Sequence, residues 1–281
     1  MLGRAHAAVP PDGVRYVSMG SSYAAGPGVG LPDPGSGGCQ RSWSNFARLV
    51  AASNRLDLVD VACSGATTRN ILEEGQHGFA PQIEAVTPGT RLVTILIGGN
   101  DVAYIPNLLA LSCLDGGGTD CGPVVSDAEV DRRFALLPDA LRAVIGAVRA
   151  RAPGAQIVLV GYLPSVPATG AGICAAVPLS LADAARIRSV AERLARVIGG
   201  VADAAGVPVV RASLIGTGHD ACSIRPFVAG AHPPRHPGWA APVAYHPDQA
   251  GMNAVARALD HILTEPGEMQ PDAAHGLDVS R

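Results

Sequence analysis

Short apolar runs alternate along this chain with longer segments of helical periodicity, and this alternation constrains the fold more than any other feature. The runs that predict strands lie at residues 15–18, 56–62, 91–97, 156–160 and 207–210. Helical spacing predicts helices at residues 43–52, 126–151, 180–205 and 249–263. Pro138 is expected to kink or divide the second of these helices. Strands separated by helices predict a parallel sheet covered on both faces, so the expected fold class is α/β: a five-stranded parallel sheet in a three-layer α/β/α sandwich.

The composition indicates a folded globular chain and excludes several classes of function. Of the 281 residues, 48% are hydrophobic and 16% charged, which is too apolar for a disordered protein. The net charge of −3 argues against a nucleic-acid binder, because such proteins usually carry a basic excess. All 21 basic side chains are arginine, so neither Schiff-base chemistry nor a P-loop lysine is available. The longest apolar runs fall far short of the roughly 20 residues of a transmembrane helix.

Three long segments rich in Gly and Pro do not fit this scaffold: residues 102–125, 163–179 and 211–244. Loops of this length in a compact domain usually carry function or cover another part of the fold. We expect residues 1–263 to form a single catalytic domain that carries these loops. The polar tail of residues 264–281 is expected to be disordered.

The six cysteines favour disulfide bonds, with six half-buried thiols as the alternative. Several pairings are open, of which the sequential one is the simplest: Cys39–Cys63, Cys113–Cys121 and Cys174–Cys222. No C-x-x-C motif occurs, which argues against a zinc or thioredoxin-like site. Residues 1–11 lack the apolar segment of a secretory signal. We therefore expect a cytoplasmic protein if Met1 is the native start, and a secreted one, which the cysteines favour, if the natural start lies upstream.

Ligands of an open parallel sheet bind beyond the carboxyl ends of its strands, so the residues that follow each strand are the candidates for chemistry. After the first predicted strand comes Ser22, at a strand-to-helix turn that can expose a nucleophilic hydroxyl. The alternative is that this serine only caps a helix. After the second strand, Gly65 can bring a bare N–H close to a ligand, or it simply forms the turn before a helix capped by Thr67 or Thr68.

Two further loops supply the remaining groups of a possible acyl-transfer site. The third predicted strand ends in Gly98-Gly99-Asn100-Asp101, where Asn100 either donates its amide to an oxyanion or belongs to an ordinary turn. His246 precedes the last helix and is a candidate general base, with a loop histidine bonded to the backbone as the alternative. A nucleophile, a base and oxyanion donors, each in a separate loop at one sheet edge, together predict acyl transfer.

The order of these motifs resembles that of the SGNH (GDSL-type) hydrolases: Gly-x-Ser near the start, then Gly, then Gly-x-Asn, then His-Pro. The resemblance covers about residues 15–263 and implies a flavodoxin-like strand order. It implies Ser22 as nucleophile and His246 as base, with an oxyanion hole formed by the N–H groups of Ser22 and Gly65 and the side chain of Asn100. The cysteine order and residues 218–222 are similar to the disulfide-bearing actinobacterial lipases and esterases, in which the three bridges run sequentially.

Two positions depart from the family pattern. Ser21 stands where the family has an acidic residue, and alignment with the motif favours Ser22 over Ser21 as the nucleophile. Val243 stands where the family often has an aspartate three residues before the histidine. The backbone carbonyl of Val243 or of a neighbour is therefore the first candidate for orienting the His246 ring, and Asp248 is a weaker one.

The resemblance implies an enzyme that forms an acyl-enzyme at Ser22, and three hypotheses of function follow. The first is an esterase or lipase that acts on carboxylic esters of short to medium acyl chains. The second is an O-acyltransferase that moves a medium-chain acyl group, such as octanoyl from acyl-CoA, to a saccharide hydroxyl, as in intracellular mycobacterial octanoyltransferases. The third is an inactive SGNH fold that binds a glycan or lipid. The expected partner is a small-molecule or glycolipid acyl ester, and no nucleic acid is expected.

Neither a cofactor nor a metal is expected. His232 and His236 have the spacing of helical metal ligands, but the prolines around them forbid the helix that would align them. Six residues in or beside the loops at the active edge either line an acyl channel or simply pack those loops: Pro27, Val29, Leu31, Ile105, Leu108 and Leu109.

Overall fold

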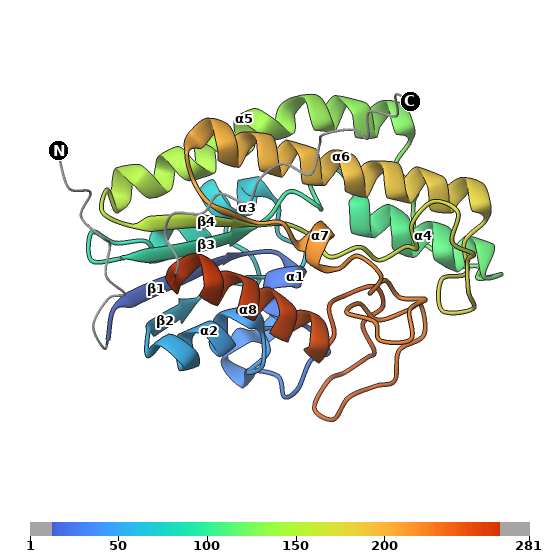
Figure 1. Ribbon diagram of the computed structural model, residues 1–281, viewed down its shortest axis with the longest axis horizontal. Helices are drawn as coiled ribbons and strands as arrows, with labels where there is room; N and C mark the ends of the chain where they lie inside the picture. Colours follow the sequence, from blue (N-terminus) through green and yellow to red (C-terminus); the bar gives the residue numbers. More distant parts are fainter. Residues whose placement is uncertain (1–12, 265–281) are drawn as a thin grey trace, which may run out of the picture.

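The computed structural model describes residues 13–264, and its centre is a parallel sheet of five strands (Figure 1). In chain order the strands are β1 (Arg15–Gly20), β2 (Asp57–Asp60), β3 (Leu92–Leu96), β4 (Gln156–Val160) and β5 (Val209–Val210). Their order in the sheet is β2-β1-β3-β4-β5, and all four pairings are parallel. This is the flavodoxin-like order, in which the chain reverses direction across the sheet between β1 and β3. The α/β class and the five predicted strands are confirmed.

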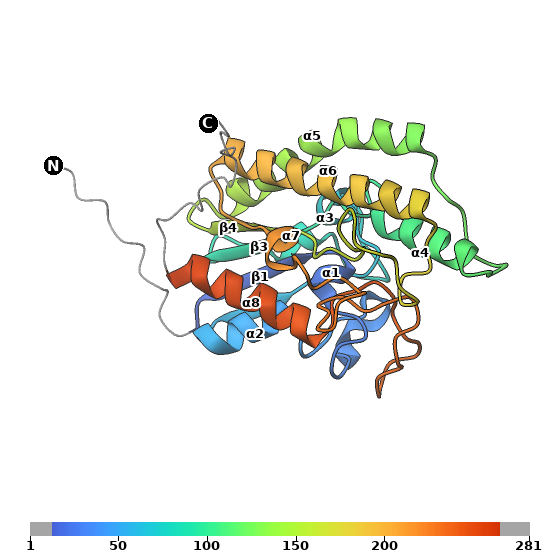
Figure 2. The same ribbon diagram turned by 45° about the vertical axis from the view of Figure 1, so that its right-hand side comes forward.

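Helices cover both faces of the sheet, as Figures 1 and 2 show from two sides. One layer holds α3 (Thr68–Leu72), α5 (Asp127–Arg151) and α6 (Leu181–Ala205), and the other holds α2 (Phe46–Asn54) and α8 (Gln249–Thr264). The remaining elements lie in the connections: α1 (Ser22–Ala25), α4 (Tyr104–Asp115), α7 (Ala212–Ile215) and the 3₁₀ turns η1 (Pro34–Cys39) and η2 (Gln82–Ala85). Among the described residues, no helix is both long and apolar enough to cross a bilayer.

The two longest helices begin where side-chain caps predict. The hydroxyl of Ser126 accepts the N–H of Glu129 at the start of α5, and Ser180 caps α6 in the same way through Asp183. Pro138 does not divide α5, which continues as one helix to Arg151. Its buried stripe packs against α6, and this packing offsets the backbone hydrogen bond that a proline removes.

The sequence prediction is wrong for residues 102–125, which it treats as a long loop. The first half of this segment forms the helix α4, which packs against α6. Seven of its residues are buried and cover most of the helix circumference, leaving Pro106 and Leu109 among the exposed residues, so the usual apolar stripe is not evident. Pro106 lies in the first turn, where a missing N–H breaks no intrahelical bond. The other two long segments contain only one short helix, α7.

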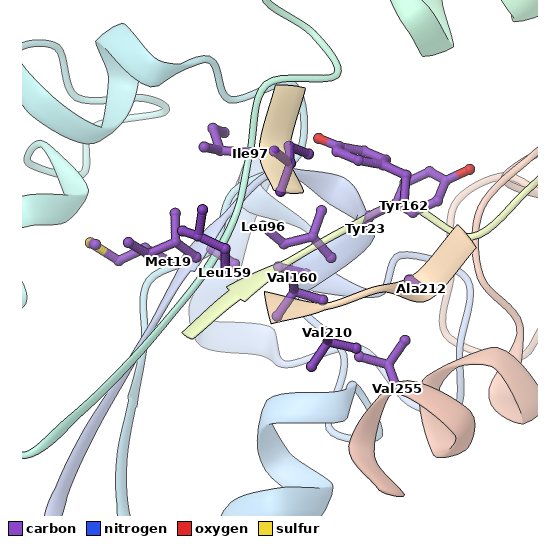
Figure 3. Close-up of a cluster of buried hydrophobic side chains, with 14 of the residues drawn as sticks. Met19, Tyr23, Leu96, Ile97, Leu159, Val160, Tyr162, Val210, Ala212 and Val255 are labelled. Carbon is purple, nitrogen blue, oxygen red and sulfur yellow. The ribbon is translucent and has the colours of Figure 1, made fainter. Parts of the chain in front are cut away.

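The core lies between the sheet and its helices and extends to the carboxyl ends of the central strands. Met19 of β1 and Leu159 of β4 point to one face of the sheet and Leu96 of β3 points to the other, as the register of the paired strands requires (Figure 3). All three are at most 2% exposed. The same cluster continues into the buried rings of Tyr23 and Tyr162, which follow β1 and β4 (Figure 3). The edge where the candidate site lies is therefore built on a rigid hydrophobic base.

Three disulfide bonds confirm the sequential pairing: Cys39–Cys63, Cys113–Cys121 and Cys174–Cys222. The first joins the end of η1 to the loop after β2, and the third joins the two long irregular segments to each other. The tail predicted for residues 264–281 lies outside the described residues, apart from Thr264 at the end of α8.

Candidate active site

The turn after β1 fixes the position of Ser22. A Cβ at Gly20 would lie 2.4 Å from the carbonyl oxygen of Leu96, so only glycine fits where β1 meets β3. The Gly20 N–H donates to Oε1 of Gln82 at 2.7 Å, which holds the end of the strand. Ser21 is the cap residue of α1, and Ser22 is its first helical residue. The strand-to-helix turn thus presents the Ser22 side chain at the carboxyl edge of the sheet.

The structure brings Ser22 and His246 together, although 224 positions separate them in the sequence. Nε2 of His246 lies 2.7 Å from Oγ of Ser22, and Nδ1 lies 2.7 Å from the backbone carbonyl oxygen of Ala244. A carbonyl can only accept, so Nδ1 carries the proton and donates it to Ala244. Nε2 is then unprotonated and accepts the Ser22 hydroxyl. This is the tautomer that a general base needs.

Burial sets the charge of His246. The residue is 7% exposed. Desolvation lowers its pKa to about 4, while the hydrogen bond to the Ala244 carbonyl acts in the opposite, weaker sense. The imidazole is therefore neutral at pH 7 and free to take a proton from Ser22.

A backbone carbonyl accepts from His246, as expected, and it belongs to Ala244, the neighbour of Val243, rather than to Val243 itself or to the side chain of Asp248. The acceptor is the carbonyl of Ala244 and not that of Val243, because Tyr245 adopts a left-handed conformation with φ 57° that turns the chain at this point. Asp248 is engaged elsewhere, since its Oδ1 accepts the N–H of Gly251 at 2.8 Å in the first turn of α8. Within residues 13–264, His246 makes no hydrogen bond to a carboxylate.

Ser21, the competing hydroxyl, faces a different partner. Its Oγ lies 3.3 Å from the hydroxyl of Tyr162, and the residue is 1% exposed. The same Tyr162 hydroxyl accepts the N–H of Gly99 at 2.9 Å. Ser21 therefore ties the loop after β1 to the loops after β3 and β4, and Ser22 alone of the two serines contacts the histidine.

Three hydrogen-bond donors, on Ser22, Gly65 and Asn100, lie at the same edge of the sheet and are the candidates for an oxyanion hole. Within residues 13–264, the N–H groups of Ser22 and Gly65 have no hydrogen-bond acceptor in the protein. Gly65 has φ 81°, a conformation that favours glycine. Nδ2 of Asn100 donates one hydrogen to the Ala66 carbonyl at 2.9 Å, which leaves its second hydrogen for a ligand.

Asp101 joins the two loops that carry Gly65 and Asn100. Its carboxylate accepts the hydroxyl of Thr68 at 2.5 Å and the backbone N–H of the same residue at 3.1 Å. Burial raises the pKa of Asp101, whereas the bonds from Thr68 oppose that rise. The loop after β3 is thus held against the start of α3, which ties together the two loops that carry the candidate oxyanion donors Gly65 and Asn100.

A cleft of about 200 Å³ is lined by Ser22, Gly65, Asn100 and His246. Its described lining carries no charged side chain when His246 is neutral, and it pairs the polar groups with an apolar wall of Pro27, Ile105, Pro106, Leu109 and Val243. Three of the six channel candidates from the sequence thus line it. Of the others, Val29 and Leu108 are buried in the core, and Leu31 is 63% exposed. The lining suits an uncharged ester with an apolar chain.

A set of buried hydroxyl groups beneath the cleft escaped the sequence prediction. The Tyr23 hydroxyl donates to the carbonyl of Tyr245 at 2.6 Å and lies 2.9 Å from Oγ of Ser165. The Tyr104 hydroxyl donates to the same Ser165 oxygen at 3.4 Å. Only the position of Tyr23 beside Ser22 hinted at this set, because its partners lie more than 140 positions away in the sequence.

This chain is similar to known proteins over most of its length, including the residues that line the cleft. The model of the GDSL-like Lipase/Acylhydrolase family matches residues 18–254. Lipase 2 of Streptomyces coelicolor is 35% identical over 213 residues, which cover 74% of this chain and 72% of that protein. A lipase of Streptomyces rimosus is 33% identical over 239 residues, which cover 85% and 82%.

Two solved structures share the fold at similar identity. The extracellular lipase of Streptomyces rimosus has a TM-score of 0.69 at 30% identity, covering 88% of this chain and 98% of that one. Phospholipase A1 of Streptomyces albidoflavus has a TM-score of 0.68 at 29% identity, with the same coverage.

Proposed function

Since the chain belongs to the GDSL-like lipase/acylhydrolase family and is an ester hydrolase, we propose that it cleaves carboxylic esters of short to medium acyl chains through an acyl-enzyme at Ser22. The observation that carries the proposal is the 2.7 Å contact between Nε2 of His246 and Oγ of Ser22, with Nδ1 bonded to a carbonyl. This geometry supplies an acceptor for the serine proton at the moment of attack.

In the acylation step, Oγ of Ser22 attacks the ester carbonyl carbon while its proton passes to Nε2 of His246. The carbonyl oxygen becomes an oxyanion and accepts hydrogen bonds from the Ser22 and Gly65 N–H groups and from Asn100. When the tetrahedral intermediate collapses, the ester C–O bond breaks and the leaving alcohol takes the proton from His246. The acyl group then remains on Ser22 as an ester.

In the deacylation step, water attacks the acyl carbon and gives its proton to the same Nε2. The carboxylic acid leaves, and Ser22 recovers its proton from His246. A single oxyanion donor of this kind is typically worth about 3 kcal/mol in the transition state. The Ala244 carbonyl stabilises the imidazolium that forms in both steps, as a carboxylate does in a serine triad.

The size and lining of the cleft support the choice of acyl chain. A volume of about 200 Å³ with an apolar wall at Ile105 and Leu109 suits a short or medium chain rather than a long one. The neutral lining supports an uncharged ester over a charged one.

A panel of small acyl esters, with mass detection of free acid and of transfer products, tests the proposal. The panel includes octanoyl-CoA with saccharide acceptors. We expect free acid from short and medium esters. Ser21→Ala should keep this hydrolytic activity to within a few-fold, whereas Ser22→Ala should lose it. Acyl transfer to the saccharide in place of free acid would favour an O-acyltransferase. No turnover and no labelling by a fluorophosphonate would leave only an inactive binding fold.

A further inference from the structure

The residue before the histidine is held in a strained conformation. Tyr245 has φ 57° although it is not glycine, and it is 1% exposed. A bulky residue rarely adopts this region of backbone space, and it does so only where its surroundings enforce it. Since Tyr245 separates the acceptor Ala244 from His246, its conformation decides whether the carbonyl and the imidazole ring face each other.

Two hydrogen bonds to hydroxyl groups hold Tyr245, one at its backbone carbonyl and one at its phenol. Its backbone carbonyl accepts the Tyr23 hydroxyl at 2.6 Å, and its own phenol shares a hydrogen bond with the hydroxyl of Ser112 on α4. Tyr23 directly follows Ser22 in the chain, and its ring lies 5.2 Å from the His246 ring at a tilt of 48°. One residue therefore connects the loop of the serine to the turn of the histidine.

The direction of the hydrogen bonds beneath the cleft is fixed by the Tyr245 carbonyl. Because that carbonyl can only accept, Tyr23 donates its single proton to it. Ser165 must then donate to the Tyr23 oxygen, and Tyr104 donates to Ser165. Burial raises the pKa of the Tyr23 phenol well above its usual value, so the donor is retained at every working pH. Each donor in such a chain strengthens the next.

We propose that Tyr23 is a positioning residue: its hydroxyl holds the Tyr245 turn so that the Ala244 carbonyl and the His246 ring stay aligned with Ser22. The proposal rests on the proposed roles of Ser22 and His246. It also explains how the site works with a backbone carbonyl, since a rigid turn does here what a carboxylate side chain does in a triad. The backbone of residues 244–246 positions the imidazole, and the Tyr23 hydroxyl is the donor that holds this backbone in place.

The test compares Tyr23→Phe with the matched control Tyr104→Phe. Both variants remove one buried phenol oxygen from the same set, but only the first removes the bond to the Tyr245 carbonyl. We expect kcat per active site of Tyr23→Phe to fall by about 10- to 100-fold with KM nearly unchanged, because misalignment of reacting groups affects the chemical step. Tyr104→Phe should stay within about twofold of the parent in both constants.

The pH profile separates positioning from a loss of structure. Phenylalanine keeps the ring against His246, so the acid limb of kcat/KM should not move in Tyr23→Phe. Equal kcat in Tyr23→Phe and Tyr104→Phe, or an acid limb shifted toward that of an exposed histidine, would overturn the proposal. If Tyr23→Phe does not fold, Tyr23→Met replaces it, since it also removes the donor to the Tyr245 carbonyl and keeps an apolar side chain. An unchanged kcat in Tyr23→Met would then overturn the proposal.

Ser22→Ala and His246→Ala complete the set. Parent-like kcat in these two variants would refute the proposed function and the role of Tyr23 together. Their inactivity, combined with a parent-like Tyr23→Phe, would refute the role of Tyr23 alone.

Discussion

Lowering the pH should leave His246 neutral in a range where an exposed histidine is already protonated. Burial lowers its pKa from 6.5 to about 4. At pH 5 about nine-tenths of the native molecules then hold the neutral base, against about 3% for an unperturbed histidine. The acid limb of kcat/KM is therefore expected near pH 4.

The same shift has a consequence for stability. In the unfolded chain the histidine binds a proton as the pH falls through 6.5, whereas the native protein binds it only near pH 4. The stability contribution is thus complete above pH 6.5 and is lost progressively as the pH falls to 4. At about 1.4 kcal/mol per pKa unit, the total loss is about 3 kcal/mol.

Urea denaturation of the parent and of His246→Gln between pH 7 and pH 4 measures this loss. Glutamine does not titrate, and the acidic residues common to both proteins cancel in the comparison. The parent should lose about 3 kcal/mol more of its free energy of unfolding than the variant over this range. Parallel stability curves, or an acid limb near pH 6.5, would refute the inference that burial keeps His246 neutral.

Three further perturbations address other parts of the site. Asn100→Ala removes one oxyanion donor and should lower kcat by about 100- to 1000-fold at similar KM; initial rates on a short-chain ester check this, and a few-fold loss would contradict it. Val243→Asp adds a carboxylate to the cleft that holds His246, so the acid limb of kcat/KM should move to higher pH, whereas Val243→Asn should not move it. Replacing Cys39 and Cys63 by serine opens a link across 24 positions and should lower the free energy of unfolding by about 3 kcal/mol in urea; an unchanged midpoint would show that the bridge adds nothing.

Much of the sheet could be predicted because its strands are short, apolar and buried. Residues 92–96 are all buried in β3, and the continuous apolar run at 91–97 predicts such a strand directly. The last strand is shorter than its apolar run, because only Val209 and Val210 pair with β4. Boundaries of this kind depend on pairing partners that the local sequence does not specify.

Helix α4 could not be predicted for a related reason. Its residues contact the core on most sides, so the alternation of polar and apolar faces that reveals a surface helix is missing. Pro106 and the glycines of residues 116–118 added the composition of a loop. The helix became recognisable only from its packing on α6.

Most residues of the candidate site could also be predicted from the sequence, but the group that orients His246 could not be assigned to one residue. Ser22, Gly65 and Asn100 follow from motifs beyond strand ends, and His246 follows from the His-Pro pair before the last helix. All four residues line one cleft. The orienting carbonyl belongs to Ala244 because of a single left-handed residue, which no local pattern announces.

Peptide mass spectrometry after reaction with a fluorophosphonate tests most directly whether Ser22 is the nucleophile. One adduct is expected, on the Ser22 side chain, formed within a few-fold of the parent rate in Ser21→Ala and much more slowly in His246→Ala. An adduct on Ser21, or labelling of Ser22 that does not depend on His246, would contradict this expectation.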